Sequence, residues 1–234
     1  YRYYFVWQMD MFEVIRALQK LGMSLGEIKE YMENRSPERF MSMMDGKKRQ
    51  IDEEIRRLKN MKRFILHEEE SVQLAMKAAL DEPRLVERDR EYLLVSDISA
   101  GSERKAAVEI AEHVRMQEKY HDTVGAVGSV YLGEDMDRGI YDRYVKVYTR
   151  LDKKTASRRV QSRPEGVYVE LYSRGHLWDM EKPYRLISAF AGERGIRLGQ
   201  MWYEDLMLDE LTVKEYEQYI VKVMVPVESK VINP

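Results

Sequence analysis

The sequence lacks cysteine altogether, and this absence excludes several classes of site. Without a thiol among its 234 residues, the chain has no disulfide, no thiolate zinc site, no iron–sulfur cluster and no cysteine nucleophile. Its four histidines show no metal-ligand spacing such as H-x-x-x-H. We therefore expect neither a metal nor a cofactor. A lack of cysteine also agrees with a reducing compartment, and we expect a cytoplasmic protein.

Long apolar runs and a strong charge of one sign are missing too. No stretch approaches the ~20 apolar residues that cross a membrane, and the first residues lack the pattern of a signal peptide. The 39 Lys and Arg residues nearly balance the 41 Asp and Glu residues, for a net charge of −2. We expect a globular chain with no membrane partner and no broad basic surface for nucleic acid.

Helical patterns fill the first ninety residues. Apolar residues recur every three or four positions from residue 9 to residue 21. Ser24 and Glu27 have the spacing of a capping box, which predicts the start of a second helix. Ser36 followed by Pro37 predicts the start of a third.

The third predicted helix has a heptad pattern. One row of the repeat is apolar throughout and the other mixes apolar residues with lysine: Met44, Ile51, Leu58 and Ile65, then Met41, Lys48, Ile55 and Lys62. The pattern fits either an amphipathic helix packed on its own domain or a dimeric coiled coil. We favour the coiled coil, because no partner helix lies beside this one in the sequence. Residues 81–84, with Pro83, break the helix and are expected to form a linker.

The region beyond residue 88 contains one order of elements twice. Each copy is predicted as strand, helix, strand, strand: residues 91–99, 102–120, 123–132 and 141–151, then residues 166–173, 178–192, 197–208 and 215–227. Matching positions such as Gly101 and Gly175 are 74 residues apart. We expect two β-α-β-β units in one mixed-to-antiparallel sheet system, with helices on one side. A ligand cleft is expected between the units, on the face that the helices leave open.

A carboxylate inside a predicted strand is the strongest sign of a binding site. Glu204 has Trp202 and Leu206 on its own face, and an unpaired carboxylate is costly to bury. It forms a structural ion pair, faces water at a sheet edge, or balances a cationic ligand, to which aromatic rings would add cation–π contacts of ~0.5–2 kcal/mol each. Six tyrosines of the predicted strands are candidates to surround it: Tyr131, Tyr144, Tyr148, Tyr168, Tyr172 and Tyr219.

A second strand carboxylate suggests an enzyme as an alternative. Glu170 has Tyr168 and Tyr172 on its face. If Glu170 met Glu204, one of the two would have a raised pKa and could act as a base. The sequence shows no nucleophile elbow, no phosphate-binding glycine loop and no Ser/His/Asp signature beside them.

Two stretches of the sequence resemble known families. The strings YRYY at residues 1–4, IRAL at residues 15–18 and LGMSLGEIK at residues 21–29 resemble the MerR family of transcription regulators. The strings YED at residues 203–205 and VMVPV at residues 223–227 resemble the GyrI-like effector-binding domain. The combination resembles the multidrug-sensing branch of the MerR family. Its pattern starts here inside the wing, so we expect a fragment that lacks the helix-turn-helix.

The resemblance implies an α+β architecture in three parts. These are a partial winged-helix domain at residues 1–35, a dimerisation coiled-coil helix at residues 36–82, and an effector-binding domain with the duplicated β-α-β-β fold at residues 88–230. Expected partners are promoter DNA, a second copy of the chain, RNA polymerase and a small-molecule effector. At the wing end, four residues would contact DNA phosphates, which position a protein without reading sequence: Tyr1, Arg2, Tyr3 and Tyr4.

The resemblance also implies a mechanism and a pocket. An effector-loaded dimer would act as an activator by untwisting promoter DNA. The acidic pocket residue of the family maps onto Glu204, and the ligand would be a lipophilic cation or an aromatic compound. Aromatic walls are expected from Trp202, Tyr144, Tyr168, Tyr219, Tyr131, Tyr148 and Trp178. We expect no enzyme; the alternatives are a GyrI-like small-molecule hydrolase with a pocket Glu as general base, and a protein-interaction module.

Overall fold

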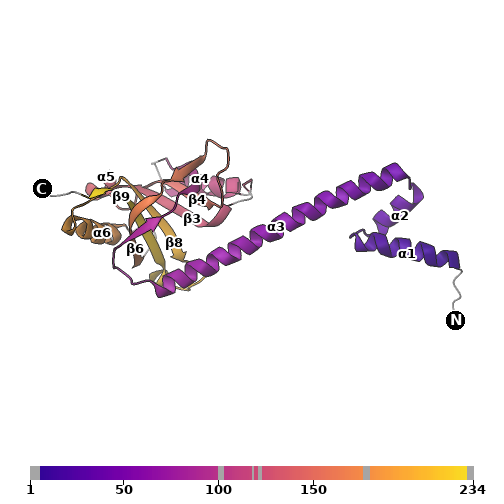
Figure 1. Ribbon diagram of the computed structural model, residues 1–234, viewed down its shortest axis with the longest axis horizontal. Helices are drawn as coiled ribbons and strands as arrows, with labels where there is room; N and C mark the ends of the chain where they lie inside the picture. Colours follow the sequence, from indigo (N-terminus) through magenta and orange to yellow (C-terminus); the bar gives the residue numbers. More distant parts are fainter. Residues whose placement is uncertain (1–5, 100–102, 118, 121–122, 176–179, 231–234) are drawn as a thin grey trace. The chain divides into compact units, whose positions relative to one another are not determined.

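The chain is made of two compact units, Tyr1–Lys59 and Asn60–Pro234. The computed structural model describes residues 6–99, 103–117, 119–120, 123–175 and 180–230. One long helix, α3 (Pro37–Lys77), belongs to both units (Figure 1). The predicted wing residues Tyr1, Arg2, Tyr3 and Tyr4 lie outside the described residues.

The first unit is helical, as the sequence predicts. It contains α1 (Val6–Lys20), α2 (Leu25–Glu33) and the first part of α3. The capping box of α2 is present: the Glu27 amide donates to Ser24 Oγ at 3.3 Å, and the Ser24 amide donates to Glu27 Oε2 at 2.7 Å. Apolar side chains of the three helices form a small core around Leu18, Met23 and Ile28.

The helix α3 is 41 residues long and begins where the sequence predicts. Its first residue is Pro37, and the Arg39 amide donates to the Ser36 hydroxyl at 3.2 Å. Three of the four side chains of the fully apolar heptad row are exposed: Ile51 is 51%, Leu58 50% and Ile65 55% exposed, whereas Met44 is half-buried. A predicted coiled-coil seam therefore remains open for a partner in this single chain.

An antiparallel sheet forms the second unit (Figure 1). Its strands are β1 (Arg84–Arg88), β2 (Glu91–Asp97), β3 (Thr123–Leu132), β4 (Tyr144–Leu151), β5 (Val160–Arg163), β6 (Gly166–Arg174), β7 (Ile196–Leu198), β8 (Met201–Leu208) and β9 (Ile220–Lys230). Its helices are α4 (Glu103–Gln117), α5 (Gly133–Asp137), α6 (Glu181–Glu193) and the short 3-10 helix η1 (Tyr216–Gln218). The strand order is β1-β6-β9-β8-β3-β4-β2-β5, with β7 paired to β9.

The strand order confirms the predicted duplication. The order β2-β4-β3 in the first copy is repeated as β6-β9-β8 in the second, and the copies join where β3 pairs with β8. The sequence did not predict β1 and β5, which are short and rich in polar residues. Each of them crosses to the other copy: β1 precedes β2 but pairs with β6, and β5 precedes β6 but pairs with β2. This exchange ties the two copies into one sheet.

Different helices cover the two faces of the sheet. On one face, His113 of α4 lies 3.0 Å from Thr149 of β4, and Ile187 of α6 packs in the core with Val223 of β9. On the opposite face, Ala75 near the end of α3 packs with Tyr172, among others. We call these the α4–α6 face and the α3 face. None of the described helices is long and apolar enough to cross a lipid bilayer.

Candidate functional site

Glu204 is a buried carboxylate on the α4–α6 face. Its side chain is on β8, and the residue is 2% exposed. The Tyr131 hydroxyl donates to Glu204 Oε2 at 2.9 Å, whereas Oε1 has no hydrogen-bond partner among the described residues. Burial raises the pKa of Glu204 to about 7, although the Tyr131 hydrogen bond opposes this rise. The carboxyl group is therefore close to half protonated at neutral pH.

Strand pairing places this acid where the two copies of the repeat meet. Alternation along β8 directs Trp202 and Glu204 to the α4–α6 face and Asp205 to the α3 face. Across the β3–β8 ladder, Ser129 lies opposite Glu204 and Tyr131 lies opposite Trp202. The sequence predicted a cleft on the face that the helices leave open. The structure instead puts Glu204 on the face that α4 and α6 cover.

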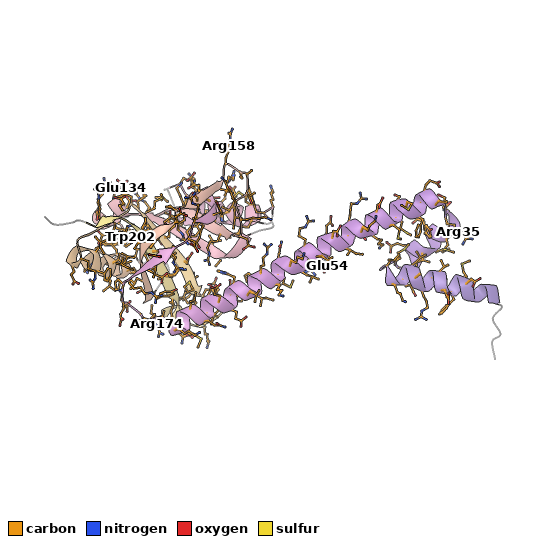
Figure 2. All side chains as sticks on the ribbon, in the orientation of Figure 1. Arg35, Glu54, Glu134, Arg158, Arg174 and Trp202 are labelled. Carbon is orange, nitrogen blue, oxygen red and sulfur yellow. The ribbon has the colours of Figure 1, made fainter. Side chains whose placement is uncertain are left out.

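Aromatic rings form a connected cluster around Glu204. Tyr131 and Tyr144 meet edge to face with ring centroids 6.2 Å apart. Trp202, labelled in Figure 2, lies 5.3 Å from the ring of Tyr184, which is 5.8 Å from the ring of Tyr141. The sequence analysis did not name Tyr141 or Tyr184 as site residues: Tyr184 lies in a helix, and Tyr141, the first residue of the predicted strand at residues 141–151, precedes β4 in the structure. Tyr131 and Trp202 are almost fully buried, so a ligand reaches Glu204 only if these side chains move.

Other predicted wall residues lie elsewhere. Tyr148 and Tyr168 are on the α3 face, in a cluster with Tyr203. That cluster already contains a cation, because the guanidinium of Arg163 lies 5.0 Å from the Tyr203 ring and 5.8 Å from the Tyr148 ring. Tyr219 precedes β9, where its ring packs against Tyr216 at a tilted angle and its hydroxyl donates to Glu210. Trp178 falls outside the described residues.

The second strand carboxylate does not meet the first. Glu170 is fully buried on the α3 face and forms ion pairs with Arg84, at 2.8 Å, and with Arg88. The sheet separates it from Glu204, so the pair of acids that the enzyme hypothesis required is not formed. Both arginines come from β1, a strand that the sequence did not predict.

Asp205, the neighbour of Glu204 on β8, is a buried acid whose charge is balanced by a cationic side chain. Asp205 lies 2.9 Å from the ammonium of Lys222 and accepts a hydrogen bond from the Tyr148 hydroxyl at 2.7 Å. Burial alone would raise the pKa of Asp205, but Lys222 and two nearby arginines hold it well below its usual range. Asp205 is thus a structural anion. In the described part of the chain, no cationic side chain pairs with Glu204 in this way.

Comparisons with known proteins show which proteins the chain is similar to. A sequence model described as "MerR, DNA binding" matches residues 11–67. A "Multidrug-efflux transporter 2 regulator" of Bacillus subtilis (strain 168) is 26% identical over 230 residues, which cover 97% of this chain and 84% of that protein. The chain is therefore similar to MerR-type DNA-binding regulators, and residues 11–67 are the part that matches the DNA-binding model.

Solved structures similar to this chain include a protein–DNA complex and a hydrolase. The EcmrR–DNA complex, seen in EcmrR-RPo, has a TM-score of 0.47 at 14% identity, covering 98% of this chain and 86% of that one. A hydrolase from Listeria innocua has a TM-score of 0.43 at 13% identity, covering 65% of this chain and 95% of that one.

Proposed function

We propose that this chain is a MerR-type regulator whose C-terminal domain binds a lipophilic cation that carries aromatic groups, with Glu204 as its counter-charge. The observation that carries the proposal is the buried carboxyl of Glu204, which has aromatic neighbours and no cationic partner among the described residues. By contrast, Asp205 has such a partner, and the tyrosines of the α3 face already contact Arg163. Glu204 is thus the buried acid for which an external cation is the missing partner.

The chemistry around Glu204 favours a cation over an anion or a neutral ligand. Faces of Trp202, Tyr131, Tyr144 and Tyr184 offer negative electrostatic potential to a cation, worth ~0.5–2 kcal/mol per contact. Flat aromatic walls with one charge discriminate weakly by shape, which suits a sensor of many compounds. The Bacillus relative named as a regulator of a multidrug-efflux transporter supports the same class of ligand.

Ligand binding would act on transcription through a dimer. We propose a partial winged-helix domain at residues 1–35, a dimerisation helix at residues 36–82 and an effector-binding domain at residues 88–230. The exposed apolar row of α3, with Ile51 and Leu58, supports pairing with a second copy. The ligand-bound dimer would untwist promoter DNA so that RNA polymerase can use the promoter. It would therefore regulate transcription by deforming DNA rather than by making new base contacts.

Two ions of matched size and opposite charge test the ligand class. Tetraphenylphosphonium and tetraphenylborate differ chiefly in the sign of their charge, so calorimetric titration of both separates charge recognition from apolar burial. We expect micromolar binding of the phosphonium and much weaker binding of the borate. In Glu204→Gln the phosphonium affinity should fall at least about tenfold, because a buried ion pair is lost.

A second buried acid supplies the matched control. Glu170→Gln removes a carboxylate that is equally buried but lies on the α3 face, so phosphonium affinity should stay within about twofold of the wild type. Equal binding of both ions, or phosphonium binding that is indifferent to Glu204, would contradict the proposal and favour a protein-interaction module.

Hydrolysis is a second candidate, favoured by one observation. A carboxyl with a pKa of about 7 is well matched to general-base catalysis near neutral pH. In that reaction Glu204 would take a proton from water as the water oxygen bonds to one carbon of an epoxide. The ring C–O bond would break, and the proton would pass from Glu204 to the resulting alkoxide to give a diol. Turnover of an epoxide that disappears in Glu204→Gln would support the hydrolase, whereas the regulator requires ligand binding without turnover.

A further inference from the structure

In the segment that follows α3, Asp81 forms hydrogen bonds and an ion pair with the sheet domain. The Asp81 amide donates to the Tyr172 carbonyl at 2.7 Å. One carboxylate oxygen accepts a hydrogen bond from the Ser173 hydroxyl at 2.7 Å, and the other lies 2.7 Å from the ammonium of Lys182. Asp81 also has a φ of 63°, in the left-handed region that Asp tolerates better than most residues. A single residue thus holds the exit of α3 by its backbone and by both carboxylate oxygens.

The partners of Asp81 connect it to the aromatic cluster around Glu204. Lys182 lies in the first turn of α6, two residues before Tyr184, whose ring packs against Trp202 at a tilted angle. Ile187, one turn further along α6, packs in the same core. Because a helix of this length moves as a rigid element, displacement of Tyr184 also displaces Lys182.

The surroundings of Asp81 leave room for such a displacement. A cavity of about 670 Å³ lies beside the contact, lined in part by Leu80, Arg174 and Lys182. The Lys182 side chain is 51% exposed and that of Asp81 is 35% exposed. An ion pair with this exposure contributes little to stability, so it can open without unfolding the domain.

We infer that the Asp81–Lys182 contact links occupancy of the Glu204 site to the C-terminal end of α3. The inference rests on the proposed function, since it requires a ligand at Glu204. Glu204, Trp202 and Tyr131 are closed over in the present structure. A bulky ligand that reaches Glu204 pushes Tyr184 outward, moves the first turn of α6, draws Lys182 away from Asp81 and loosens the exit of α3. Lys182 is then a positioning residue that does not touch the ligand.

Hydrogen–deuterium exchange of the full chain, with and without saturating tetraphenylphosphonium, tests the link. The readout is the backbone amide of Asp81 and its neighbours at residues 78–82. We expect the phosphonium to speed exchange there at least about threefold in the wild type. In Lys182→Met the exchange should be fast already without ligand and should change little on binding, while phosphonium affinity stays within about threefold. Lys182→Arg, which keeps the charge, should restore the wild-type response.

Arg185→Met is the matched control. Arg185 lies on the same helix and forms an ion pair with Glu181 rather than with Asp81. This variant should respond to the phosphonium as the wild type does. A full wild-type response in Lys182→Met, or no response at residues 78–82 in a wild type that binds the phosphonium, would overturn the inference alone. Failure of the wild type to bind the phosphonium would overturn the proposed function and this inference with it.

Discussion

Two adjacent acids on β8 carry opposite electrostatic roles. Asp205 and Glu204 are both buried, but the first faces Lys222 and the hydroxyl of Tyr148 whereas the second faces aromatic rings and one tyrosine hydroxyl. Lys222 keeps Asp205 ionised, and burial brings the pKa of Glu204 to about 7. The side of the strand on which each residue lies decides whether it stabilises the fold or is left available for a ligand.

Glu204 should make stability depend on pH. Because its folded pKa of about 7 lies above its ordinary value of 4.5, its contribution is fully present below about pH 4.5 and is lost as pH rises through 7. Glutamine in its place stays neutral at every pH. Glu204→Gln should therefore gain stability relative to the wild type between pH 5 and pH 8, by up to about 3 kcal/mol for a shift of this size.

Urea unfolding of both proteins at pH 5 and pH 8 measures this difference. The wild type carries several other titrating groups, but they are common to both proteins and cancel in the comparison. A difference in unfolding free energy that is the same at the two pH values would contradict the raised pKa of Glu204.

At the scale of elements, α3 approaches β3 closely at Gly125. Gly125 has a φ of +80°, and a Cβ added there would lie 2.1 Å from Nε2 of His67, which is on α3. Arg150 of β4 donates to the same nitrogen at 2.8 Å. Burial and Arg150 lower the pKa of His67 to about 4, so the ring is neutral and can accept this hydrogen bond at physiological pH.

Substitution of Gly125 should lower the stability of the domain by more than backbone strain alone explains. Gly139 has a nearly equal φ of +78° but nothing within 4 Å of the position of its Cβ. Gly139→Ala should cost about 1–2 kcal/mol from strain, and Gly125→Ala should cost about 1–3 kcal/mol more from the clash. Thermal unfolding measures both. If the clash is responsible, His67→Ala in the Gly125→Ala background should recover part of the loss; equal effects of the two alanines would contradict this account.

The same scale explains what the sequence could and could not predict. Alternation along residues 202–206 was sufficient to put Trp202 and Glu204 on one face. It did not assign Tyr144 and Tyr148, because the β3–β4 ladder has register shifts near Gly128 and Tyr131 that alternation does not reveal. Tyr184 was not predicted as a site residue, because it lies in a helix and the predicted tyrosines lie in strands. The strands β1 and β5 have no alternating pattern and depend on pairing with distant strands.

At the scale of the whole molecule, the chain combines a region that matches the MerR DNA-binding model with a duplicated sheet domain. The heptad, the capping box and the 74-residue repeat spacing can be read directly from the order of residues, so the sequence predicts these parts well. Tertiary packing decides which buried acid lacks a cationic partner, because Lys222 meets Asp205 and Arg84 meets Glu170 only when their strands pair in the sheet. The proposed function depends on that difference between the acids.

The affinity for tetraphenylphosphonium as a function of pH tests the central claim most directly. Only the ionised carboxylate of Glu204 balances a cation, and a pKa of about 7 means that its ionised fraction rises roughly 30-fold between pH 5.5 and pH 8. Calorimetric titration of the wild type should show a gain in affinity of that order, and Glu204→Gln should bind weakly and equally at both pH values. Wild-type affinity that does not change with pH, or a similar gain in Glu204→Gln, would contradict the claim that this carboxylate receives the ligand.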